Sequence, residues 1–191
     1  MSTESASRLA QRRGFIFNTV SGGLSAVAVA TLAGAPGLAT AAPRSDATVE
    51  NDLRILGTAV AAEYEAVAAY GVGADSGLLS APTLQVATAF RDHHRQHVDA
   101  LTAAIKKLGG SAPAERKHEF PLSELKTEAD VLRFAASLER GAVSAYAGAI
   151  PLFDNRDLSK AAASILADEA MHWAVLRNAL GQDPVPGAFF S

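Results

Sequence analysis

The sequence has no cysteine among its 191 residues, and this absence limits the chemistry that the protein can use. Disulfides, thiolate nucleophiles, iron–sulfur ligation and lipid attachment through an N-terminal cysteine are all excluded. A metal site in this chain must therefore be built from nitrogen and oxygen ligands.

A strong charge of either sign is also missing. The net charge is −3, the isoelectric point is about 5.9, and no stripe of lysine and arginine is interleaved with aromatic residues. Such a stripe is typical of nucleic-acid-binding proteins, so we exclude nucleic acid as a partner. Apolar side chains, in contrast, make up 49% of the residues, which is enough for the core of one globular domain.

The first forty residues differ in composition from the rest of the chain. A polar start leads to Arg12 and Arg13, which precede an apolar triplet and a weakly apolar run rich in glycine, alanine, serine and threonine. This order resembles a twin-arginine export signal, and Ala39 and Ala41 supply the small residues that a signal peptidase needs.

We interpret residues 1–41 as a signal peptide and residues 42–191 as the exported domain. The expected partner is the twin-arginine export machinery, and the expected location is the periplasm, the cell wall or the medium. An uncleaved membrane anchor is the alternative, but the low hydrophobicity of the run and Pro36 disfavour it. We therefore expect no membrane span after cleavage.

Helical periodicity extends over four long segments of the remaining chain, namely residues 49–74, 82–108, 128–153 and 158–180. Thr127 and Asp157 are the expected N-caps of the last two helices, and Gly109 and Gly181 the expected ends of the second and fourth. The first and third connections are short, whereas the middle one is long. This pattern predicts an all-α, antiparallel four-helix bundle with a long crossover between helices two and three.

An internal repeat relates the two halves of the chain. "AEYEAVAAY", which begins at Ala62, and "LERGAVSAY", which begins at Leu138, are identical at five of nine positions. In the same register, "HHRQHVDAL" from the second helix aligns with "DEAMHWAVL" from the fourth. Three polar pairs follow from this alignment: Glu63 with Glu139, His94 with Glu169, and His97 with His172.

Most of these polar residues interrupt apolar stripes instead of lying on a solvent-facing side. Burying three carboxylates and three imidazoles without partners would cost several kcal/mol each, a total comparable with the roughly 5–15 kcal/mol stability of a domain. Two divalent cations would neutralise them, because carboxylates bridge metals and an i, i+3 pair presents two ligands on one helix face. The predicted ligands are Glu63, His94, His97, Glu139, Glu169 and His172.

With these residues the chain resembles the ferritin-like superfamily of dinuclear carboxylate proteins. That pattern has one glutamate from each of two helices and a Glu-x-x-His pair from each of the other two. Glu63 and Glu139 match the single carboxylates and Glu169 with His172 matches one pair, but His94 stands where the other pair has glutamate. The export signal, "AVAAYGVGA" and "GQDPVPGAFF" resemble exported bacterial ferritin-like domains with no assigned activity.

The resemblance implies two metal ions, most naturally iron or manganese, with zinc or copper as alternatives. It implies either redox chemistry on dioxygen, peroxide or ferrous iron, or a non-catalytic metal-binding or structural protein. Because His94 replaces a carboxylate, three negative ligands would face two cations of total charge about +4, which favours the lower oxidation state. A homodimer is compatible with the sequence.

Several neighbouring side chains have two interpretations each. His93 could replace His94 as ligand, although the repeat register favours His94, and Asp168 could either hydrogen-bond a ligand histidine or lie on the surface. For Tyr70 and Tyr146 we favour core packing, with the hydroxyl on a helix carbonyl, over a role at the site. The remaining expectations are helix contacts for Tyr64 and Trp173, solvent exposure for His118 and space filling for Met171.

Overall fold

The structure is a computed structural model that describes residues 45–190. The segment that we interpret as an export signal, and its cleavage site, lie outside these residues. Between residues 45 and 190, no helix combines the length and the apolar character that a membrane crossing requires.

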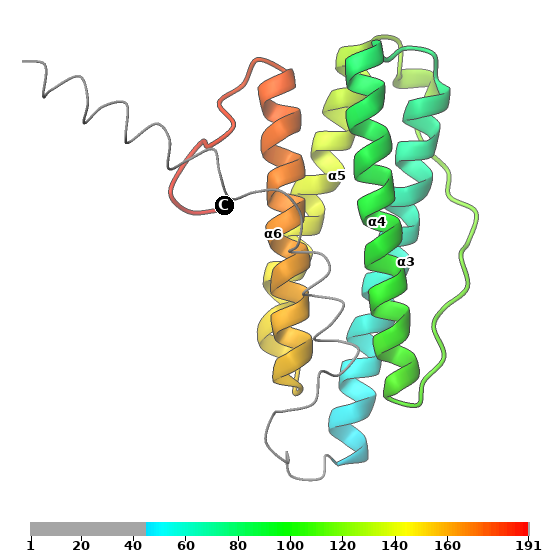
Figure 1. The fold of residues 1–191 in the computed structure, drawn as a ribbon, viewed down its shortest axis with the longest axis vertical. Coiled ribbons are helices and arrows are strands. Elements are labelled where there is room, and N and C mark those ends of the chain that lie inside the picture. Colours follow the sequence, from blue (N-terminus) through cyan, green and yellow to red (C-terminus); the bar gives the residue numbers. More distant parts are fainter. Residues whose placement is uncertain (1–44, 191) are drawn as a thin grey trace, which may run out of the picture.

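Four long helices form the molecule, and the described residues contain no strand, which confirms the all-α prediction. They are α3 (Asp46–Asp75), α4 (Ala81–Lys107), α5 (Glu128–Ala149) and α6 (Arg156–Ala179). Figure 1 shows α3 and α6 running in one direction and α4 and α5 in the other. The connection between α4 and α5 passes along the outside of the bundle and contains one short 3₁₀ turn, η1 (Leu122–Glu124).

Local sequence signals explain where the helices begin and end. Thr127 caps α5 in a reciprocal capping box with Asp130, as expected. The predicted cap of α6 is wrong by two residues, because Asn155 is the N-cap and its side chain accepts a hydrogen bond from the backbone of Asp157. Gly109 and Gly181 follow α4 and α6 with φ of 81° and 71°, a conformation that glycine adopts without strain.

The third helix is shorter than predicted. Instead of continuing to Phe153, α5 ends at Ala149 and a 3₁₀ turn, η2 (Ile150–Leu152), follows. Pro151 explains the difference, because proline has no backbone N–H to continue the α-helical ladder.

The helices pack mainly as two pairs, α3 with α4 and α5 with α6. Asp52, which is fully buried in α3, ties the pairs together by accepting backbone hydrogen bonds from Asp154 and Asn155 in the connection between α5 and α6. At the other end, Glu128 accepts hydrogen bonds from the backbone and hydroxyl of Ser80.

Two apolar clusters fill the bundle. The larger one includes Leu56, Leu101, Ile105 and Ile165, and the smaller one includes Phe90, Leu132 and Leu176. The buried charged residues of α3 to α6 other than Asp52 lie at the level between these clusters. This apolar packing covers the polar layer above and below along the bundle axis.

Candidate metal centre

The six predicted ligands converge inside the bundle. Five of them are at most 3% exposed, and the side chain of His97 is 12% exposed. They form two overlapping groups whose nitrogen and oxygen atoms lie close enough to hold an ion each: Glu63, His94, His97 and Glu169 in the first, and His94, Glu139, Glu169 and His172 in the second.

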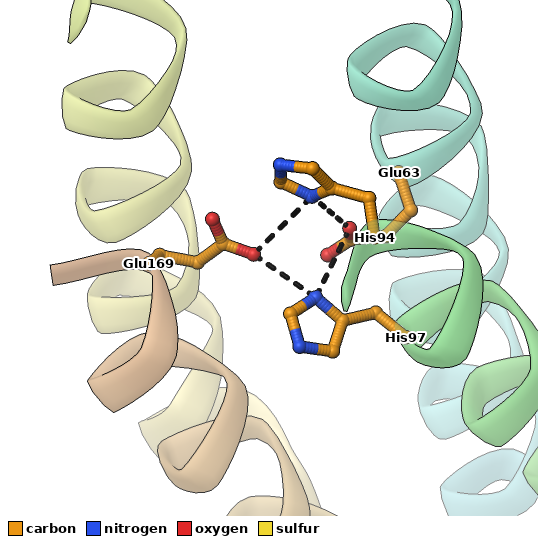
Figure 2. A group of neighbouring side chains, drawn as sticks. All are labelled: Glu63, His94, His97 and Glu169. Atoms are coloured by element: carbon orange, nitrogen blue, oxygen red, sulfur yellow. Dashed lines mark hydrogen bonds and ion pairs between the residues drawn. The ribbon is translucent and has the colours of Figure 1, made fainter. Parts of the chain in front are cut away.

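The first group, shown in Figure 2, joins α3 and α4 to Glu169 of α6. His94 Nδ1 lies 2.9 Å from Glu63 Oε2 and 3.6 Å from Glu169 Oε1. His97 Nδ1 lies 3.3 Å from the same Glu63 oxygen and 3.1 Å from the same Glu169 oxygen. Ligands bound to one ion at about 2.1 Å are separated by roughly 3.0–3.5 Å, so this spacing suits a single ion.

The second group lies on the α5 and α6 side of the same layer. His94 Nε2 is 3.4 Å from Glu139 Oε1, and His172 Nδ1 is 3.5 Å from that oxygen and 3.6 Å from Glu169 Oε2. His94 and Glu169 therefore take part in both groups, each with a different atom. The repeat register pairs these two residues, so the two groups are related in the same way as the two halves of the chain.

Unsatisfied buried atoms show that a cation suits this site. Both carboxylate oxygens of Glu169 and Nδ1 of His172 are buried without a well-formed hydrogen bond to any described residue. Such atoms are expensive to leave without partners, and carboxylate oxygen and imidazole nitrogen are good ligands for iron, manganese and zinc. The donor set therefore fits metal ions at the two groups.

Without a cation, the buried histidines and carboxylates of the layer shift one another's pKa values. Burial alone would raise the pKa of Glu63, but hydrogen bonds from His94 and His97 lower it to about 2. Burial opposes charge on these histidines too, yet their carboxylate partners raise the pKa of His94 to about 10 and that of His97 to about 12. The pKa of Glu169 is raised, chiefly by burial.

The tyrosines reach the carboxylates directly. Tyr70 of α3 donates its hydroxyl to Glu139 of α5, and Tyr146 of α5 donates to Glu63 of α3 at 2.6 Å. The expectation of a hydrogen bond to a helix carbonyl is therefore wrong, because each ring crosses the bundle instead of folding back on its own helix. Burial raises the pKa of both phenols, and the neighbouring carboxylates raise it further.

Asp168 holds the outer nitrogens of the histidines. Its Oδ2 lies 3.3 Å from Nε2 of both His97 and His172, and 3.0 Å from Nδ1 of His93. The structure supports the interpretation of Asp168 as a partner of ligand histidines, a role that fixes which ring nitrogen faces the metal. His93 belongs to neither inner group and has a 38% exposed side chain.

Two other expectations are wrong. Met171 is 53% exposed and does not fill space at the site, because its position on α6 faces away from the bundle. His118 is only partly exposed, since it stacks on Phe120 in the crossover. Tyr64 packs against the larger apolar cluster and Trp173 against the smaller one, as helix contacts.

An apolar cavity of about 480 Å³ leads to the centre between α3 and α5. Small residues line it, among them Ala62, Ala66, Gly141, Ala142 and Gly148, and its inner end reaches Glu63, His94, Glu139 and Tyr146. The cavity gives a small molecule a route to the ligands. Periodicity did not predict it, since alanine at these positions is equally typical of close helix packing.

Residues 51–182 match the ferritin-like domain family. Among solved structures, the crystal structure of a conserved hypothetical protein from Mycobacterium tuberculosis matches with a TM-score of 0.64 and 22% sequence identity. The match covers 74% of this chain and 99% of that one, and at this identity it supports the fold alone. No curated protein matches the chain.

Proposed function

Because this chain belongs to the ferritin-like domain family, we propose that its buried layer binds two divalent metal ions, iron or manganese, and that it acts as an oxidoreductase on dioxygen, peroxide or ferrous iron. The observation that carries the proposal is that the two ligand groups share His94 and Glu169. In each of these two residues, one side-chain ligand atom faces the first group and the other faces the second group. One residue pair thereby serves two adjacent positions.

Each residue has a defined part in this proposal. Glu63 and His97 would hold one ion and Glu139 and His172 the other. Glu169 would contact both through its two oxygens, and His94 would bind either ion through one nitrogen, or both after losing its ring N–H. The bound pair would supply electron transfer to a small oxidant. Asp168 keeps the N–H of His97 and His172 on the outer side, and Tyr70 and Tyr146 orient the glutamates that they bond.

Zinc or copper is the alternative metal, because the centre contains three imidazoles. The apolar cavity favours a catalytic centre over a purely structural one, because a structural site needs no route for a second reactant. Neutral small molecules such as dioxygen and hydrogen peroxide would cross its alanine and glycine walls without the desolvation cost of an ion.

We further propose export by the twin-arginine pathway, on the sequence pattern around Arg12 and Arg13. Replacing both arginines by lysine should retain the precursor inside the cell, as fractionation would show. Unchanged export would contradict the proposal.

The activity is tested by loading the exported protein with ferrous iron without oxygen and then adding dioxygen or peroxide. We expect iron oxidation faster than in the protein-free control, and its loss in Glu139→Ala. Ala142→Leu, which narrows the cavity while leaving the ligands in place, should retain two ions and react more slowly. If the loaded protein is inert to both oxidants, and the manganese form leaves peroxide intact, the non-catalytic function replaces this one.

A further inference from the structure

A third cluster of potential ligands lies outside the two inner groups, between α4 and α6. His93 Nδ1 is 3.0 Å from Asp168 Oδ2 and 3.0 Å from His172 Nε2, and the last two atoms are 3.3 Å apart. These three atoms are close enough to hold one ion. Their separations also fall near those of neighbouring ligands on one divalent cation, roughly 3.0–3.5 Å.

This cluster differs from the inner groups in its exposure. The side chains of His93 and Asp168 are 38% and 17% exposed, whereas Glu63, His94, Glu139, Glu169 and His172 are almost completely buried. A cation that approaches from solvent between α4 and α6 therefore meets His93 and Asp168, with the 12% exposed His97 beside them, before the almost completely buried ligands. The cavity between α3 and α5 is a poor route for a hydrated ion, because its walls are mainly apolar.

His172 connects the cluster to the centre. Its Nε2 faces His93 and Asp168, and its Nδ1 faces Glu139 and Glu169. A cation could thus move from one nitrogen of a single ring to the other without crossing an apolar layer. Simultaneous binding at both nitrogens requires loss of the ring N–H, so a filled inner position weakens the outer one.

We propose that His93, Asp168 and His172 form an outer binding site for a divalent cation, which captures the ion and passes it to the buried centre. The delivery step rests on the proposed function, whereas the binding site does not. The repeat supports the assignment, because His93 and Asp168 occupy equivalent positions in the two halves. The competing explanation is that Asp168 only accepts hydrogen bonds and that His93 is a surface residue.

Cobalt(II) tests the site directly, because its anomalous scattering locates bound ions and its absorption follows their uptake. In crystals of the protein saturated with cobalt(II), we expect a peak between His93, Asp168 and His172 that is weaker than the inner peaks. An outer peak without inner peaks would support the binding site and contradict the proposed centre. Inner peaks without an outer one would overturn the outer site, and the absence of all peaks would overturn both.

Variants of His93 test delivery. His93→Ala should lose the outer peak, keep the inner ones and fill the centre about tenfold more slowly, since local capture raises association rates by about 10-fold or more. His93→Asp introduces an aspartate, the residue that stands at the equivalent position of the second half as Asp168. This variant should restore both the outer peak and the rate at which the centre fills. His118→Ala removes the one histidine outside these clusters and should change neither. Uptake that is equally fast in His93→Ala would overturn the delivery step.

Discussion

The two halves of the bundle share a scaffold but differ in charge. Glu63 and Glu139, His97 and His172, and Tyr70 and Tyr146 occupy matching places, whereas His94 in α4 faces Glu169 in α6. The first half thus contributes mainly imidazole and the second mainly carboxylate. The repeat thus fixes where the ligands stand, while the pair His94 and Glu169 decides the charge that the centre presents to a cation.

This difference also affects the layer without metal. Glu63 has hydrogen bonds from two histidines and a depressed pKa, but Glu169 has no well-formed hydrogen bond to a described residue and its pKa is raised. Of the two residues shared by both groups, Glu169 is therefore the less satisfied one. A cation would stabilise the folded chain most at this point.

The largest effect is expected from removing the shared carboxylate. Glu169→Ala should abolish binding of both ions, because each group loses a ligand, whereas Glu139→Ala should weaken mainly the second group. Metal content per chain, measured after loading and dialysis, distinguishes the two variants. Retention of two ions by Glu169→Ala would show that the groups do not share this residue.

A substitution that makes the halves alike should destabilise the metal-free protein. His94→Glu adds a fourth buried carboxylate to the ligand layer and removes an imidazolium partner of Glu63, at a cost of about 3 kcal/mol or more in the free energy of unfolding. Added iron or manganese should recover much of this loss, because the extra carboxylate is a strong ligand. Melting with and without a chelator measures both changes, and His94→Gln is the control that removes the imidazole without adding charge.

The pH dependence of stability should have opposite signs with and without metal. The folded pKa values of His94 and His97, about 10 and 12, exceed the ordinary value of 6.5. Their contribution to stability is therefore complete below pH 6.5 and is lost as the pH rises toward those values. Metal binding needs neutral imidazoles, so its stabilisation should grow over the same range.

On the acid side, the pKa values of Glu63 and Asp168 are lowered to about 2. Their contribution is complete above their ordinary pKa values and is lost as the pH falls toward 2. Melting temperatures between pH 2 and 9, with chelator or with manganese, test the sign on both sides. A metal-induced gain that shrinks as the pH rises would contradict ligation by these histidines.

A smaller effect is expected from the tyrosines. Tyr146→Phe and Tyr70→Phe each remove one hydrogen bond to a buried carboxylate, which is worth about 1.5–3 kcal/mol when the acceptor is charged. Because the bonds cross the bundle, Tyr146→Phe should weaken the ion held by Glu63, and Tyr70→Phe the ion held by Glu139. Affinity measurements on the two positions compare the variants, and equal losses at both ions would contradict the crossed assignment.

Periodicity and the repeat were sufficient to predict four helices, the long crossover and the inward direction of Glu63, Glu139, Glu169 and His172. They could not show that Tyr70 and Tyr146 reach across to the opposite glutamates, because this depends on the distance between helices that are far apart in sequence. His94 faces both ligand groups because of the orientation of its ring, and the spacing of residues in the sequence does not fix that orientation. His93 was predicted only as a substitute for His94, because spacing alone does not show that it meets Asp168 and His172 outside the two inner groups.

The crossover between α4 and α5 is the segment of chain that joins the two helix pairs. It contributes none of the six predicted ligands, and each ligand group takes side chains from both of the helix pairs that it joins. A proteolytic cut in the crossover would therefore leave two fragments, each with an incomplete set of ligands for either ion. With no disulfide available in a chain without cysteine, bound cations would then be a link between the fragments that a chelator can remove.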